Sequence, residues 1–360
     1  MALSRIDTTN MIEDVPQSKL DNNINFRNLI INGDMSIDQR NSGSSVTATN
    51  GGYTIDRWLT GSSQSSKFTV DQETDAPTGF SYSVKLTSSA ATTPGASDQY
   101  WFAQNIEGFN TAYLEYGNSN AKTVTVSFHV KSSLTGTFSG SLMNSAYNYS
   151  HPFTYSISSA NTWEKKSVVI TGATAGTWIG ATNGVGIRMY FSLGNGSNFL
   201  GTAGSWSASQ NNGATGETQF VATSGATLFI TGVQLEAGTT ASDFEFLPHD
   251  VNQHRCERYY QTSQAFIGNG SSVAGSCVGE TTVSTKMRAS PSLSLSGNFV
   301  VTDGYTADYT QSSASIGVYQ NSADTRSFFV ILTNLPTLTQ AKPYHSRHSN
   351  SSVIQFSAEL

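Results

Sequence analysis

The chain has 360 residues, of which 37% are hydrophobic, 11% aromatic and only 12% charged, and its formal net charge is −6. Disordered chains are poor in aromatic residues and rich in charge, so this composition predicts folded domains. The negative balance and the scattered Lys and Arg argue against nucleic acid and against an anionic membrane surface. We expect no membrane insertion and no secretory signal, because the chain has no apolar run of the required length.

Residues 1–25 are polar and too few to build a core of their own. We expect them to be either a loose terminus or an attachment segment that becomes ordered on a partner protein.

Most of the remaining chain alternates apolar and polar residues, which is typical of half-buried strands. Apolar residues take every second position in 124–130 and in 185–191, and the pattern returns in 229–235 and 292–296. The segment 327–332, which is apolar from Phe328 onward, predicts a strand that is buried on both faces. No amphipathic helix of useful length competes, so we predict an all-β protein.

Asn-Gly pairs predict turns between these strands, because both residues tolerate positive φ. The pairs begin at Asn50, Asn183, Asn195, Asn212 and Asn269. Segment 248–260 differs, with Pro near its start, no Gly and good helix formers, and it predicts a helix of one to three turns. We take it as the linker between a domain at 26–247 and a smaller β domain at 261–360.

Two cysteines, Cys256 and Cys277, are too few for a disulfide framework and lack the spacing of metal ligands. We therefore expect two reduced, buried thiols. His345 and His348 could share one face of a helical turn and bind a metal. Because neither helical context nor a nearby carboxylate supports that arrangement, we expect loop histidines.

Several short segments after residue 26 are distinctive. They are Arg-Asn-Leu-Ile-Ile-Asn-Gly-Asp-Met-Ser at 27–36, then Asp56–Trp58, Asn161–Lys166, Phe229–Gly238, Phe244–Phe246, Arg255–Gln261, Met287–Pro291 and Ser357–Leu360. The first of them resembles the opening strand of carbohydrate-binding-module jelly rolls. In this order and at this spacing, the whole series resembles tail-fibre and minor virion proteins of tailed bacteriophages.

The resemblance implies a jelly-roll β-sandwich, a homotrimer and a tail-fibre role in host adsorption. Its ligand would be bacterial surface polysaccharide or lipopolysaccharide, bound multivalently. The protein would be made in the cytoplasm of the host bacterium and become part of the virion. Residues 1–25 would then attach the chain to other virion proteins of the tail or neck, through Met11, Ile12, Val15, Pro16 and Leu20.

Carbohydrate-binding modules of this kind often hold a structural calcium ion with a Glu after Asn-Gly-Asp-Phe and an Asp on the last strand. At the matching positions this chain has Ser36 and either Thr231 or Gly232. A hard cation needs several oxygen ligands with carboxylates among them. Asp34 and Glu236 remain as candidates, but we predict no metal and no cofactor.

Sugar rings stack on flat aromatic faces, with amide and hydroxyl groups around them. The sequence predicts two exposed clusters, Tyr100 with Trp101 and Tyr147 with Tyr149, and places Trp206 in a loop. The alternative that stays open is that these rings pack within their own domain or in a subunit interface. The other tryptophans adjoin predicted strands and are expected in the core or between the sheets: Trp58, Trp163 and Trp178.

A glycoside hydrolase needs two carboxyl groups about 5–9 Å apart. Asp71, Glu73 and Asp75 lie close in sequence, and Glu115 lies near two tyrosines, but solvated loops show the same patterns. The chain has no nucleophile elbow, no phosphate-binding loop and no β-helix repeat. We predict that it is not an enzyme. Two alternatives stay open, namely a virion adaptor or decoration protein that binds no receptor, and a surface-polysaccharide depolymerase.

Overall fold

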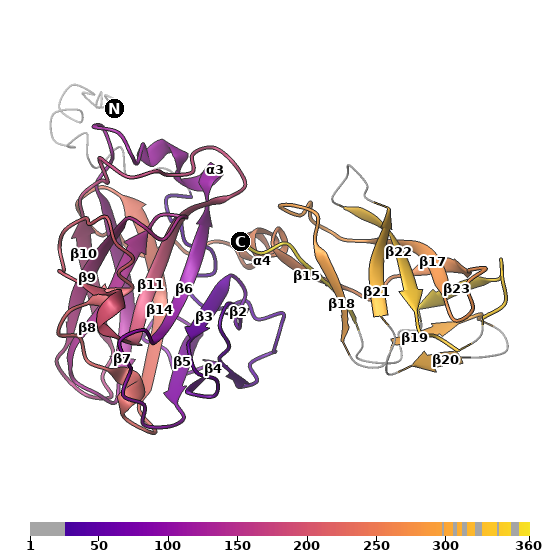
Figure 1. The fold of residues 1–360 in the computed structure, drawn as a ribbon, viewed down its shortest axis with the longest axis horizontal. Helices are drawn as coiled ribbons and strands as arrows, with labels where there is room; N and C mark the ends of the chain where they lie inside the picture. Colours follow the sequence, from indigo (N-terminus) through magenta and orange to yellow (C-terminus); the bar gives the residue numbers. More distant parts are fainter. Residues whose placement is uncertain are drawn as a thin grey trace, which may run out of the picture.

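A computed structural model describes residues 26–296, 299–304, 308–311, 315–320, 326–336, 338–346 and 353–360. Two β-rich parts follow each other along the chain, and helix α4 (His249–Glu257) connects them (Figure 1). In the described part, no helix is long and apolar enough to cross a membrane. The predicted attachment residues lie outside the described residues: Met11, Ile12, Val15, Pro16 and Leu20.

Residues 26–247 form the first part, a jelly-roll sandwich of two six-stranded sheets. The first sheet pairs its strands in the order β1 (Val46–Thr47), β4 (Phe68–Glu73), β5 (Ser83–Ser88), β14 (Thr227–Ala237), β7 (Val124–Ser132) and β10 (Glu164–Ile170). The second sheet has the order β2 (Gly52–Tyr53), β3 (Trp58–Ser62), β6 (Gln99–Glu107), β11 (Val185–Asn195), β8 (Gly136–Met143) and β9 (Ser150–Ile157). Short elements complete it: α3 (Gly108–Thr111), η1 (Ala112–Leu114), η2 (Ser197–Phe199), η3 (Phe220–Ala222) and the paired β12 (Leu200–Gly201) and β13 (Gly213–Ala214).

Strand alternation determines which side chains fill the sandwich. Strand β7 contributes four inward residues that are at most 1% exposed: Val124, Val126, Phe128 and Val130. Burial of each such side chain stabilises the fold by about 1.5–3 kcal/mol. Trp58 stacks on Phe102 in the same core, with ring centroids 4.8 Å apart, so its predicted core position is confirmed.

The outer face of the second sheet is also covered. Trp101 is 7% exposed, and its indole lies so close to Gly61 that a Cβ there would come within 2.0 Å of the ring. Tyr190 meets Trp101 edge-on at 4.9 Å. Tyr100 points into the core and is 0% exposed. The prediction of an exposed Tyr100–Trp101 pair is therefore wrong, because both residues lie in β6 and both faces of this strand are buried.

The second part packs a three-stranded sheet against a seven-stranded sheet, as far as the structure describes them. The smaller sheet has the order β15 (Tyr260–Ser263), β24 (Val353–Ser357) and β18 (Ser292–Ser296). The larger sheet has the order β20 (Asp308–Gln311), β19 (Phe299–Thr302), β23 (Pro343–Ser346), β16 (Ile267–Gly270), β17 (Cys277–Thr282), β22 (Ser327–Thr333) and β21 (Ser315–Gln320).

Strand β22 is not buried on both faces, contrary to the prediction. Phe328 and Val330 fill the second core, whereas Phe329 between them is exposed. On the outer face of the seven-stranded sheet, Phe329 and Ile267 are exposed to solvent. The continuous run of apolar residues in β22 therefore does not mean that both faces of the strand are buried.

Three local predictions can be compared directly with the structure. Helix α4 begins directly after Pro248, whose fixed φ suits a helix start, so the predicted helix is confirmed. Cys256 and Cys277 are free and buried, as expected. Asn269-Gly270 is not a turn but the end of β16, where Gly270 pairs with Cys277.

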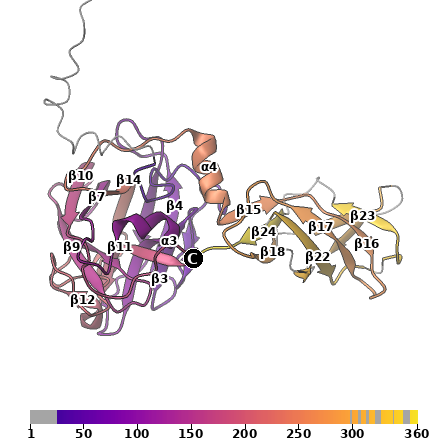
Figure 2. The same ribbon diagram turned by 90° about the horizontal axis from the view of Figure 1, so that it is seen from above.

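The last residues of the chain return to the first part, and Figure 2 shows the C-terminus beside it. The Glu359 carboxylate forms ion pairs with the buried Arg57 and, at 2.7 Å, with Arg40. The Tyr53 hydroxyl donates a hydrogen bond to the Leu360 carbonyl at 2.7 Å. The two parts are therefore joined by contacts of the C-terminal residues as well as by α4.

Candidate functional site

The five aromatic residues predicted to bind sugar do not form one site. The two on β6 are buried, as described above. Tyr147 is exposed and lies under the Arg188 guanidinium, whose carbon is 4.1 Å from the ring centroid. Tyr149 and Trp206, in contrast, come together, with ring centroids 5.6 Å apart and planes at 6°.

Tyr149 and Trp206 belong to a larger group of rings, here called the aromatic cluster, which also contains Tyr116, His151 and Trp178. Trp178 stands edge-on to Trp206 at 5.5 Å, and Tyr116 stands edge-on to Trp178 at 4.9 Å. The His151 ring lies 5.1 Å from Trp206. Offset and edge-on arrangements at these distances are the favourable ones, so the rings hold one another in place.

The cluster is assembled by loops that leave β6, β8 and β10 and by the loop between β12 and β13, while His151 lies on β9. Glu115 ends the short turn η1 with φ of 56°. Gly117 has φ of 90°, and a Cβ there would lie 3.2 Å from Trp178. Gly176 has φ of 84°, and a Cβ there would lie 2.8 Å from Tyr149. Both glycines are needed where they are, because they combine positive φ with a close approach to a ring.

A hollow of about 240 Å³ opens beside the cluster. Tyr116 and Trp178 supply its aromatic wall, and Thr111, Glu115 and Asn118 supply polar groups. Glu115 and Asn118 are exposed. Within the described residues, the Glu115 carboxylate accepts no hydrogen bond and forms no ion pair, so it is available to a ligand.

Burial keeps two titratable rings of the aromatic cluster uncharged. It lowers the pKa of His151 and raises the pKa of Tyr116, so both are neutral near pH 7. The Tyr116 hydroxyl and Nδ1 of His151 are buried and have no hydrogen-bond partner among the described residues. Glu115 is then the one formal charge among the residues lining the hollow, which suits a neutral ligand rich in hydroxyl groups.

Tyr116 and Trp178 were not predicted to bind sugar. Trp178 was expected in the core, but it is only partly buried and lies in the loop between β10 and β11. Its neighbours, Thr-Ala-Gly-Thr before it and Ile-Gly after it, have a loop composition that could have indicated this. Trp163 is not in the core either: its ring packs on Phe229 at 6.2 Å and its indole N–H donates to Asp75 at 3.2 Å.

Lysines pair with three of the four acidic residues considered for catalysis, namely Asp71, Glu73 and Asp75. Lys85 lies 3.2 Å from the carboxylate of Asp71 and 2.8 Å from that of Glu73. Lys131 pairs with Asp75 and thereby lowers the pKa of that carboxyl. These contacts stabilise the outer face of the first sheet and do not place two free carboxylates across a common hollow.

The residues considered for metal binding have different surroundings where the structure describes them. Glu236 is buried and accepts a hydrogen bond from the Gln234 side chain at 2.8 Å. Asp34 lines a different hollow, which is described below. His345 lies on β23, so the expectation that it is a loop residue is wrong, and His348 lies outside the described residues. In the described part, no group of three or more His, Cys, Asp or Glu side chains gathers into a metal site.

No protein-family model matches the chain, and no curated protein matches it in sequence. Among solved structures, the enzymatically active domain of tailspike protein 4 of bacteriophage CBA120 is 16% identical, with a TM-score of 0.32, over 59% of this chain and 22% of that one. The carbohydrate-binding module TmCBM61, solved with β-1,4-galactotriose, is 11% identical over 59% of this chain and 99% of that one, with a TM-score of 0.29. The C-terminal family 22 carbohydrate-binding module of Clostridium thermocellum Xyn10B is 12% identical over 57% and 99%, with a TM-score of 0.28.

Proposed function

We propose that this chain binds bacterial surface glycan at the aromatic cluster, as a tail-fibre protein with which a tailed bacteriophage adsorbs to its host. One observation carries the glycan binding: in a hollow of about 240 Å³, the Trp178 and Tyr116 rings lie beside Glu115 and Asn118. A pyranose ring has an apolar face for an aromatic ring and hydroxyl groups for a carboxylate or an amide.

Each group in the hollow has a chemical role in this proposal. The Trp178 ring supplies the stacking surface. The Glu115 carboxylate accepts hydrogen bonds from sugar hydroxyls, and the Asn118 amide both donates and accepts. Each Å² of apolar surface that is removed from water on binding contributes about 25 cal/mol to the binding free energy. The hollow is small compared with pockets that enclose drug-sized ligands, about 300–1,000 Å³, so the affinity of one site is low.

We further propose that the glycan is bound without being cleaved. Hydrolysis of a glycosidic bond uses two carboxyl groups, typically about 5–9.5 Å apart. Among the residues that line this hollow, Glu115 is the one carboxylate. The acids at 71, 73 and 75 are held by Lys85 and Lys131.

The virion role in this proposal is supported by the sequence resemblance, which extends from 27–36 to 357–360. Residues 1–25 would attach the chain to tail or neck proteins, and three copies would form a homotrimer. Three aromatic clusters would then face one cell surface.

The test is binding of the purified protein to an array of bacterial surface polysaccharides, with reducing-end release assayed on every glycan that binds. Trp178→Ala is expected to weaken binding about tenfold, because it removes the stacking ring. Trp163→Ala is the matched control, since Trp163 is also partly buried but its ring packs on Phe229 of the first sheet.

Equal loss in both variants, or no loss in either, would contradict the proposed site. Release of reducing ends would favour a depolymerase. A folded protein that binds none of the glycans would favour an adaptor or decoration role in the virion.

A further inference from the structure

A second hollow, of about 260 Å³, lies where residues 34–36, the loop between β4 and β5 and the start of α4 meet. It combines a carboxylate, hydroxyl groups and an imidazole with two aromatic rings. The residues that line it include Asp34, Ser36, Ser81, Tyr82, Phe246 and His249. None of these residues belongs to the aromatic cluster.

Asp34 is held rigidly at the edge of this hollow. The residues on either side of Gly33-Asp34 adopt positive φ, 57° at Asn32 and 58° at Met35. Gly33 packs so closely that a Cβ would lie 2.1 Å from the Val233 carbonyl oxygen. Positive φ is costly for a residue such as Met, so surrounding contacts fix the turn and with it the position of the carboxylate.

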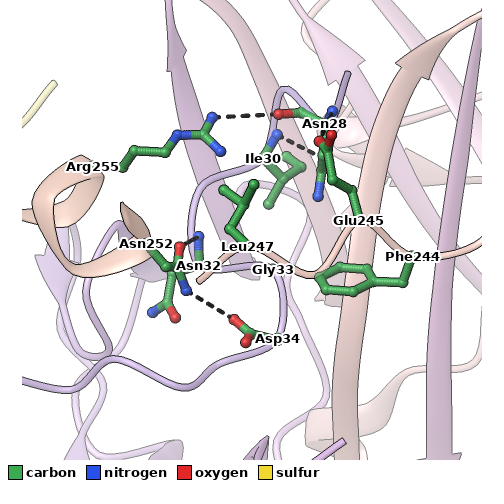
Figure 3. A pocket seen from close by; sticks show the side chains of 10 residues that line it. All are labelled: Asn28, Ile30, Asn32, Gly33, Asp34, Phe244, Glu245, Leu247, Asn252 and Arg255. Atoms are coloured by element: carbon green, nitrogen blue, oxygen red, sulfur yellow. Dashed lines mark hydrogen bonds between the residues drawn. The ribbon is translucent and has the colours of Figure 1, made fainter. Parts of the chain in front are cut away.

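A hydrogen bond from α4 orients the Asp34 side chain. Asn252 Nδ2 donates to Asp34 Oδ1 at 3.2 Å (Figure 3). The same nitrogen donates to the Ser36 hydroxyl at 3.1 Å. The other carboxylate oxygen, Oδ2, accepts no hydrogen bond among the described residues. One oxygen therefore fixes the carboxylate and the other remains free to accept hydroxyl groups.

Figure 3 shows a smaller hollow that shares Asp34, Leu247 and Asn252 with the larger one. Its volume is about 10 Å³. That is close to the minimum for one water molecule, so the small hollow is no ligand site of its own. It adjoins the larger hollow through these shared residues, and it has no lining residue from the loop between β4 and β5.

The apolar side of the larger hollow is an exposed but well-supported ring. Phe246 is 56% exposed. It packs on Phe80 at 5.0 Å and on Phe244 at 4.8 Å between ring centroids. An aromatic ring that two others hold in place loses little freedom when it binds a ligand, and leaving it in water is unfavourable.

We propose that this hollow is a second saccharide site that takes one pyranose residue, with Phe246 against an apolar face of the sugar and Asp34 Oδ2 accepting its hydroxyl groups. This inference rests on the proposed glycan binding and adds a second contact to it. The volume of about 260 Å³ lies below the range of about 300–1,000 Å³ for drug-sized ligands, so it fits one ring and not a chain.

The experiment uses methyl pyranosides of glucose, galactose, mannose and N-acetylglucosamine as probes. Binding is measured by saturation-transfer NMR and titration on the full chain, first in the Trp178→Ala background, which lacks the stacking ring of the aromatic-cluster site. Residual binding is expected there. Adding Phe246→Ala or Asp34→Asn is expected to weaken it about tenfold. Phe109→Ala is the matched control, because Phe109 is also 56% exposed, and it is expected to change nothing.

The outcomes separate the two proposals. If Trp178→Ala alone abolishes all binding, the second site is overturned and the aromatic cluster stands. If Trp178→Ala changes nothing and Phe246→Ala abolishes binding, the second site stands and the proposed function at the cluster fails. If no probe binds, or if Phe109→Ala weakens binding as much as Phe246→Ala, the second site is overturned. Unchanged thermal midpoints exclude misfolding as the cause of a loss.

Discussion

Asp56 is a carboxylate that the fold buries with few compensating contacts. Its oxygens accept hydrogen bonds from the backbone N–H of Gln39 at 2.5 Å and from the Gln39 amide at 3.1 Å. Burial raises the pKa of Asp56 to about 7, and this effect outweighs the opposing influence of the Arg40 charge and of the Gln39 N–H. The folded protein therefore binds a proton here at pH values where an unfolded chain has lost it.

This raised pKa makes stability depend on pH in a defined direction. Between about pH 4, where the unfolded carboxyl titrates, and about pH 7, the folded state holds more protons, so the free energy of unfolding falls as pH rises. Asp56→Asn is expected to remove this pH-dependent decrease in the free energy of unfolding, which amounts to at most about 4 kcal/mol. Urea denaturation of both proteins at about pH 5 and about pH 8 measures the difference. Identical pH dependence in the two proteins would contradict the assignment.

Sequence alternation predicted burial well where one strand alone determines it. The inward residues of β7 and the core position of Trp58 are of this kind. It failed for Tyr100 and Trp101, because the cover over Trp101 comes from Tyr190 on β11 and from the close approach of Gly61 on β3. No local pattern shows which distant strand will lie beside a residue.

The candidate site was only half predicted, because the sequence of one strand does not show which distant strands will pair with it. Strand β14 pairs with β5 and β7, although about half the sandwich sequence separates it from either. Such pairings are decided by the packing of the whole sheet. They bring the loops after β6, β8 and β10 together, so Tyr149 and Trp206 were recognisable as loop aromatics, but their contact with Tyr116 and Trp178 was not.

The C-terminal residues after β24 tie the second part to the first through one buried carboxylate. Glu359 faces Arg57, which is 1% exposed and lies 3.5 Å from the Tyr259 ring centroid. A buried charge that loses its partner is strongly destabilising, by about 3–5 kcal/mol. The strength of this tie depends on Glu359 because Arg57 stays charged in any case.

We therefore expect Glu359→Gln to lower the free energy of unfolding by about 3 kcal/mol, measured by urea denaturation. Glu73→Gln is the control, because Glu73 is 35% exposed and pairs with Lys85 at the surface. Its cost is expected to stay below about 1 kcal/mol. If the two substitutions cost the same, the buried ion pair does not hold the two parts together.

At the scale of the whole molecule, low affinity at a small, open hollow is compatible with firm adsorption only if several copies act together. Three linked sites can raise the apparent affinity by about 10²–10⁴ without any new contact. We expect analytical ultracentrifugation to give the mass of a trimer, and binding to a dense glycan surface to exceed binding of the soluble oligosaccharide by about that factor. On a sparse surface the glycan chains lie too far apart for one trimer to bind two of them, so this gain in apparent affinity should disappear. A monomer that binds equally well at both densities would contradict the multivalent mechanism, while leaving the aromatic cluster as a single weak site.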